Sequence, residues 1–206
     1  MMVTDRMLRG WMFLTIGFLC LVVSGCASTP ATRFYTLSTL PGSEKGNGPG
    51  WEPCVSIGIG PVRIPSYLDQ PGIVTQVSLN EYRVEEFSRW SEPLGDNVSR
   101  ILANNLTILL CTKLVSIFPW RSSMPFDYRL FVDITRMDGV LGESAILNAS
   151  WMIFDGADKK RLLVAKQTTC KVPLTDKSYE SFVAAQSRNL GVLSREIAAA
   201  IKISPR

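Results

Sequence analysis

The sequence predicts an α+β fold, a mostly antiparallel β-sheet with two amphipathic helices packed on it. Three observations lead to this prediction. Segments of alternating apolar and polar residues occupy most of the chain, and two longer segments have the helical period of 3.6 residues. Their order is strands, a helix, more strands and a second helix. The composition, 46% hydrophobic and 19% charged over 206 residues, suits one domain with a sizeable core.

Alternation of apolar and polar residues between turn residues predicts strands at 33–38, 54–64, 73–79, 82–90, 114–120, 128–137, 145–154 and 162–172. The third and fourth of these form a hairpin around Asn80 and Glu81, and residues 155–160 form the turn before the last strand. Residues 40–53 are dense in glycine and proline, so we interpret them as a loop that connects strands within the domain.

Two segments have helical periodicity. Residues 94–113 begin after Pro93, which suits a first helical turn, and carry Cys111 on the stripe opposite the apolar face. We therefore expect Cys111 outside the main core, facing another surface or another cysteine. The apolar face of this helix consists of Val98, Ile101, Leu102, Asn105 and Leu109. Residues 178–202 form the second helix, with an apolar face of Phe182, Val183, Leu190, Leu193, Ile197 and Ile201.

The sequence offers little catalytic chemistry. It contains no histidine, which excludes Ser-His-Asp triads, Cys-His pairs and His-ligated zinc. The body cysteines, Cys54, Cys111 and Cys170, form no CxxC motif and allow at most one disulfide, whose pairing stays open. The acidic pairs fall on a strand or in a turn, namely Glu85 with Glu86 and Asp155 with Asp158. We expect no catalytic residue, no metal and no cofactor, and the diffuse net charge of +4 argues against a nucleic-acid partner.

The first 25 residues have the features of a bacterial lipoprotein signal peptide. Arg6 and Arg9 precede an uncharged apolar segment at 11–23, which is shorter than the roughly 20 residues of a membrane-spanning helix. The following Val23-Ser24-Gly25-Cys26 looks like a lipobox, in which small residues precede the cysteine that takes the diacylglyceryl group. The alternatives are an ordinary signal peptide or a single membrane helix that contains a cysteine. We predict a signal peptide at 1–25 and lipidation of Cys26.

Residues 26–32 then form a lipidated cysteine with a short tether, followed by one domain at 33–206. Three acyl chains, palmitate among them, anchor a protein stably, whereas one chain binds only marginally. The six residues 27–32 reach only about 20 Å when extended, so the body stays beside its own membrane. By resemblance to enterobacterial sorting signals, Ala27 in place of an aspartate after the lipidated cysteine favours the outer membrane.

Two long motifs resemble one protein family. They are IGIGPVRIPSYLDQP at 57–71 and RWSEPLGDNVSR at 89–100, and the aromatic strand FYTL at 34–37 also matches. Together with the lipobox they resemble the ABC-type transport auxiliary lipoproteins over essentially the whole mature chain. The resemblance implies a non-enzymatic lipoprotein of the outer membrane, facing the periplasm, in an MCE-type phospholipid transport system that supports envelope integrity.

The partners that this resemblance implies are an MCE-domain protein similar to paraquat-inducible protein B, its inner-membrane components and outer-membrane lipid. A homo-oligomer, the lipid, the direction of transport and the use of ATP stay open. A second function class also stays open, a lipid-binding carrier with an apolar cavity of roughly several hundred Å³ between sheet and helices. A filled core favours docking instead.

Four motif residues are candidates for partner binding. Tyr67 and Leu68 lie in a turn stiffened by prolines, where they either form an exposed contact surface or cover the edge of the sheet. Arg89 and Trp90 are residue types enriched at binding hot spots. Trp90 has the alternative of packing beneath the start of the helix.

Overall fold

The protein's computed structural model describes residues 30–42, 54–121 and 123–204. The predicted signal peptide, Cys26, most of the tether and most of the loop at 40–53 lie outside these residues. The strands are β1 (Arg33–Tyr35), β2 (Val55–Arg63), β3 (Gly72–Ser78), β4 (Glu81–Trp90), β5 (Thr112–Ile117), β6 (Tyr128–Val140), β7 (Ser144–Asp155) and β8 (Leu162–Pro173). The helices are α2 (Leu94–Leu109) and α3 (Tyr179–Ile203). The predicted α+β fold class is confirmed.

The strands form two mixed sheets, where the sequence suggested one. The larger sheet has the order β5-β2-β6-β7-β8, and the smaller has the order β1-β4-β3. Long antiparallel pairing joins β6, β7 and β8, whereas β2 is parallel to both of its neighbours. The predicted hairpin is the antiparallel pair β3 and β4, and β1 adds to it in parallel. We call this smaller unit the three-stranded sheet.

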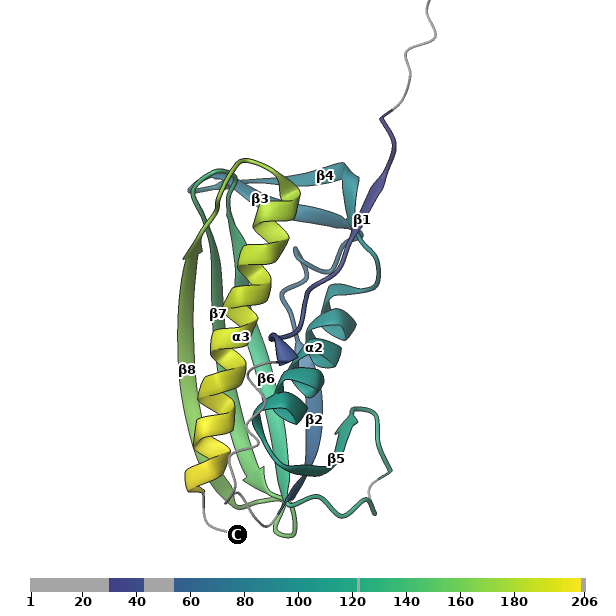
Figure 1. Cartoon of the computed structure of the whole chain (residues 1–206), viewed down its shortest axis with the longest axis vertical. Helices are drawn as coiled ribbons and strands as arrows, with labels where there is room; N and C mark the ends of the chain where they lie inside the picture. The colour runs from purple at the N-terminus through teal and green to yellow at the C-terminus, as the bar shows by residue number, and fades with distance from the viewer. Residues whose placement is uncertain (1–29, 43–53, 122, 205–206) are drawn as a thin grey trace, which may run out of the picture. The chain divides into compact units, whose positions relative to one another are not determined.

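Both helices cover one face of the five-stranded sheet (Figure 1). α3 packs on β7 and β8, α2 packs on β2 and β5, and the two helices contact each other. The six apolar residues predicted for the face of α3 are all buried. Ser178 caps this helix by accepting a hydrogen bond from the Ser181 N–H, and Lys202 lies in the last turn, where a cation complements the helix dipole.

A disulfide explains where α2 ends. The prediction extended this helix to residue 113, but the backbone becomes extended at Leu110. Cys111 then bonds to Cys54, 57 residues earlier, with a Cα–Cα distance of 4.6 Å. The main-chain oxygen of Cys111 also accepts a hydrogen bond from the Val55 N–H at 2.9 Å. Cys170 is the free cysteine of the described residues, and it is buried. Of the two expectations for Cys111, contact with another cysteine is therefore the one found.

Candidate functional site

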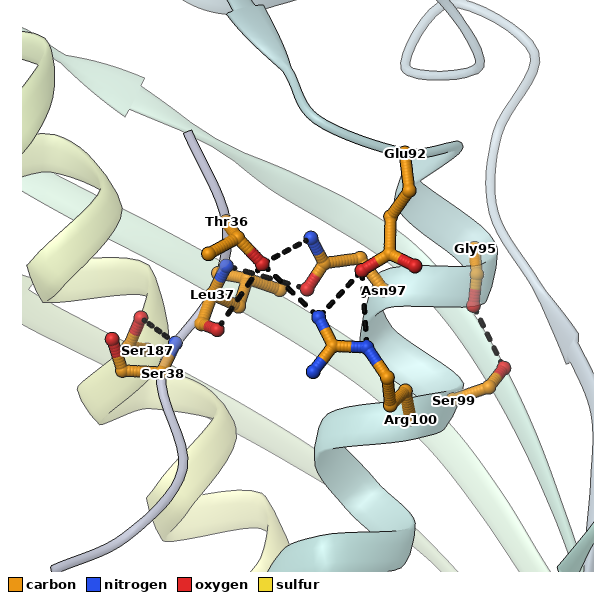
Figure 2. Close-up of polar contacts among 9 residues, drawn as sticks. All are labelled: Thr36, Leu37, Ser38, Glu92, Gly95, Asn97, Ser99, Arg100 and Ser187. Carbon is orange, nitrogen blue, oxygen red and sulfur yellow. Dashed lines mark hydrogen bonds and ion pairs between the residues drawn. The ribbon is translucent and has the colours of Figure 1, made fainter. Parts of the chain in front are cut away.

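The second motif holds the segment that follows β1. We call residues 36–40 the strap; it runs between α2 and α3 (Figure 1). The side chain of Asn97 accepts a hydrogen bond from the Leu37 N–H at 3.3 Å and donates one to the Thr36 hydroxyl at 3.1 Å. From the other helix, the Ser187 hydroxyl accepts a hydrogen bond from the Ser38 N–H at 3.0 Å (Figure 2). The strap is thus bonded to both helices.

A second asparagine repeats the arrangement two helical turns later. Asn105 accepts a hydrogen bond from the Leu40 N–H at 2.8 Å, and its amide donates to the Ser194 hydroxyl of α3 at 3.0 Å. Asn97 and Asn105 are both 0% exposed, and a buried amide is stable only when it is hydrogen-bonded. An eight-residue spacing places both on the same face of α2, where they satisfy main-chain groups of the strap.

Arg100 completes this cluster at the start of α2 (Figure 2). Its Nε and Nη2 both donate to Oε1 of Glu92, and Nη2 also donates to the Thr36 hydroxyl at 3.0 Å. The side chains of Arg100 and Glu92 are 43% and 31% exposed, so the ion pair adds little to stability. Its effect is to fix the position of the Thr36 hydroxyl. Two residues of the second motif, Asn97 and Arg100, therefore bond to the strap, and Glu92 fixes the side chain of Arg100.

The first motif contributes a polar connection between the two sheets. Tyr67, in the turn between β2 and β3, donates its hydroxyl proton to Oδ2 of Asp138 on β6 at 2.8 Å. Arg136 donates from Nε to Oδ1 of Asp138 at 2.7 Å and from Nη2 to Gln76 on β3 at 2.6 Å. Asp138 is 0% exposed, and a buried charge is destabilising unless it is paired. Arg136 provides the opposite charge. Burial, and then the Asp138 carboxylate, raise the pKa of Tyr67.

The structure separates the four predicted partner-binding residues. Leu68 is 2% exposed and Trp90 is 7% exposed, so both pack in the core and neither presents its side chain at the surface. Both side chains belong to the hydrophobic core, which is closer to the packing alternatives than to an exposed contact surface. Tyr67 is half-buried, with its ring 5.0 Å from that of Tyr82. Arg89 is exposed and donates from Nε to the Glu86 carbonyl oxygen at 2.8 Å. Partner contact through Tyr67 or Arg89 stays a prediction.

The acidic pairs have structural roles. Asp155 accepts hydrogen bonds from the N–H groups of Ala157 and Asp158 in the β7–β8 turn, and these bonds lower its pKa. Glu85 accepts a hydrogen bond from the Tyr179 hydroxyl at 3.0 Å. Within the described residues there is no cluster of three or more Cys, Asp or Glu side chains placed to hold a metal. No helix in the same part of the chain is long and apolar enough to cross a membrane.

Sequence reasoning missed the residues that connect the parts of the fold. Asn105 was placed on the apolar face of its helix, and a polar residue there is itself a signal of a buried hydrogen bond. Asn97 lies on the same face and carries the same signal. Asp138 carried no such signal in the sequence. Its contacts with Tyr67 and Arg136 depend on strand pairing and on a turn, and the sequence pattern defines neither.

Comparisons with known proteins agree with this architecture. The model of a family described as ABC-type transport auxiliary lipoprotein component matches residues 35–198. Among curated proteins, none matches the sequence. A crystal structure of an uncharacterized protein has a TM-score of 0.67 at 17% identity, covering 84% of this chain and 99% of its own. A Xanthomonas campestris protein of the DUF330 family has a TM-score of 0.67 at 16% identity, covering 83% and 96%. At these identities the likeness to both structures shows the fold alone.

Proposed function

Because the chain belongs to the family of ABC-type transport auxiliary lipoprotein components, we propose that it is a docking protein of an MCE-type lipid transport system. It is held in the outer membrane by acyl chains on Cys26 and faces the periplasm. There it receives the end of an MCE-domain protein that is connected to components in the inner membrane. Members of this family are described as transport auxiliary components, which are not a known class of enzyme. This agrees with a docking role.

The observation that carries this proposal is the strap. Residues 36–40 come soon after the proposed tether, and Asn97, Asn105 and Arg100 bond them to the helix pair. A carrier that leaves its membrane has no need to fix its first residues this way. A docking protein does, because a fixed strap leaves only the short tether between its body and the membrane.

The disulfide supports a location outside the cytoplasm. Cys54 and Cys111 are bonded, and structural disulfides persist in oxidising compartments such as the bacterial periplasm. This supports an exported protein, as the predicted signal peptide at 1–25 requires.

The packing favours docking over the lipid carrier. The space between α3 and the five-stranded sheet holds the side chains of Phe182, Leu190, Leu193 and Ile197, each at most 1% exposed. Four grooves among the described residues, with volumes of about 310, 340, 480 and 580 Å³, are open to solvent. The last of these runs along the solvent side of α3, beside the strap. A carrier requires instead a closed apolar space that shields the acyl chains.

Crosslinking in whole cells, followed by affinity purification of this chain, tests the proposal. An MCE-domain protein should be recovered with the parent chain and with Cys170→Ala, which leaves the proposed anchor intact. Cys26→Ala should remove the protein from the membrane fraction and lose the partner. Arg89→Ala should reduce the recovered partner, while Arg188→Ala, at another exposed arginine, serves as its matched control. The proposal fails if the parent chain never recovers an MCE-domain protein, or if the purified domain turns over a lipid.

A further inference from the structure

Exposed apolar side chains gather on the three-stranded sheet. Twelve large hydrophobic side chains are exposed among the described residues, and five belong to this small sheet and its turn. They are Phe34 (66% exposed), Val77 (42%), Leu79 (91%), Tyr82 (43%) and Val84 (47%). We call these five residues the exposed apolar group. Large apolar side chains left exposed on a surface are candidates for contact with another apolar phase or protein.

One member of the exposed apolar group, Phe34, lies where the chain leaves the body, and the other four lie along the β3–β4 hairpin toward its tip. β1 begins at Arg33, seven residues after Cys26, and seven extended residues reach about 24 Å. Phe34 is in β1 itself, and β1 pairs with β4 so that Phe34 lies opposite Arg89. The tether therefore limits how far this end of the body can move from the acyl chains.

The opposite end of the body is much farther away. The start of α3 contacts the three-stranded sheet, because the Tyr179 hydroxyl donates to Glu85 of β4. Figure 1 shows α3 running away from the three-stranded sheet. The helix has 25 residues, which at 1.5 Å per residue give a length of about 37 Å, and Ile203 is its last residue. This length exceeds the reach of the tether. The three-stranded sheet is thus the end of the body that a lipid anchor holds closest to the bilayer.

We propose that Phe34 and the tip of the β3–β4 hairpin, with Leu79 at its apex, lie in the interface of the bilayer that holds the acyl chains of Cys26. This inference rests on the proposed lipidation. The occupant of the surface is the lipid itself, since chain length brings that bilayer to this sheet. The acyl chains hold the protein in the membrane, and the exposed apolar group fixes which end of the body faces the lipid.

Apolar area, and not charge, would provide the contact. The sheet carries three arginines and three glutamates, namely Arg33, Arg83, Arg89, Glu81, Glu85 and Glu86. Their charges balance, so attraction to anionic headgroups adds little. Phe and Leu side chains gain by leaving water for the acyl boundary, as the apolar faces of interfacial segments do. We therefore expect the contact to form equally on zwitterionic and anionic vesicles.

Fluorescence from two labelled positions tests the inference on the full lipid-modified chain. Leu79→Cys and Ile203→Cys place one accessible thiol at either end, since Cys54 and Cys111 are bonded and Cys170 is buried. Ile203 is the matched control, because it is an aliphatic residue that is 82% exposed. Each thiol is labelled with an environment-sensitive nitrobenzoxadiazole dye, and the protein is reconstituted into phosphatidylcholine vesicles with or without phosphatidylglycerol. The unsubstituted chain measures the background from Cys170.

The dye at position 79 should shift its emission to the blue and be quenched by spin-labelled lipid, whereas the dye at 203 should behave as in water. Adding Phe34→Ser should lower the ratio of membrane-inserted to water-exposed dye at position 79 by about tenfold, and Ile203→Ser should not. If vesicles sediment with the protein but the dye at 79 stays in water, the inference is wrong while the anchor stands. If the chain does not sediment with vesicles, both the proposed lipid anchor and this membrane contact are wrong. Capture of an MCE-domain protein is a separate result that neither outcome alters.

Discussion

Asn105 accepts a hydrogen bond from the main-chain N–H of Leu40 at 2.8 Å, although 65 residues separate the two in sequence. Leu40 is 8% exposed, so this N–H has no ready access to water as an alternative partner. The amide nitrogen of the same side chain donates a hydrogen bond to the Ser194 hydroxyl of α3. One buried side chain thus joins the strap, α2 and α3.

Asn105→Ala should therefore lower the free energy of unfolding by about 1–3 kcal/mol, because it leaves the Leu40 N–H and the Ser194 hydroxyl without this partner. Asn104→Ala, at the adjacent exposed position, should change the stability by less than about 0.5 kcal/mol. Urea denaturation measures both changes. Hydrogen exchange at Leu40 should accelerate in the first variant alone, and equal exchange rates in the two variants would contradict the role given to Asn105.

Tyr67 makes stability depend on pH in alkaline solution. Burial and the Asp138 carboxylate raise its pKa in the folded protein, while the unfolded chain keeps the ordinary value of about 10. Above that pH the unfolded state has lost the proton that the folded state still holds, so the free energy of unfolding falls as pH rises. Tyr67→Phe should make this decline shallower when urea denaturation is repeated from pH 9 upward. An unchanged slope would show that Tyr67 ionises equally in both states.

Two glycines of the motifs should respond to alanine in opposite directions. Gly60 has φ +118°, and an added Cβ would lie 2.8 Å from Cβ of Phe118. Gly60→Ala should therefore lower the free energy of unfolding by more than about 1 kcal/mol. Gly95 lies in α2, where an added Cβ finds its nearest contact at 4.0 Å, with Ile64. Gly95→Ala should stabilise the protein by up to about 1 kcal/mol through helix propensity. Thermal unfolding of the two variants checks the signs, and two changes of the same sign would count against this reading.

Removal of the disulfide should be costly. Replacing Cys54 and Cys111 with serine should lower the free energy of unfolding by about 2–4 kcal/mol, since the bond closes a loop of 57 residues in the unfolded chain. Cys170→Ala keeps the bond and is the control. Thiol titration of the denatured, unreduced parent chain should find one free cysteine in the body, Cys170. Three free thiols would exclude the bond.

The helices and the hairpin could be predicted from sequence because their signals are local. The predicted helix at 178–202 differs by one residue at each end from α3, since its apolar residues recur from Phe182 to Ile201 and Ser178 caps it. The division into two sheets could not be predicted. It depends on parallel pairing of β1 with β4 and of β2 with β5 and β6, and period-two alternation indicates which residues share a face but not which strand lies alongside.

The candidate site was predicted in its segments but not in its contacts. The motif at 89–100 does hold a group of interacting side chains, yet Trp90 lies in the core and Glu92, Asn97 and Arg100 make the bonds. Asn97 and Arg100 have partners in the strap, about 60 residues earlier in the chain, and Glu92 fixes the side chain of Arg100. Residue type alone favours Trp and Arg as contact residues, and it says nothing about burial, which decides their role here.

The strap also determines how a pull on the tether would be distributed through the protein. Tension arriving at Arg33 runs along β1, whose main chain is hydrogen-bonded in parallel to β4, and next reaches residues bonded to Asn97, Ser187 and Asn105. These bonds belong to two helices and a sheet, so several must break together before the first strand can be drawn out. A pull from the membrane would then rotate and translate the whole domain without changing its internal structure. Single-molecule extension from residue 30 would register this as one high-force event in place of a gradual release of the N-terminal segment.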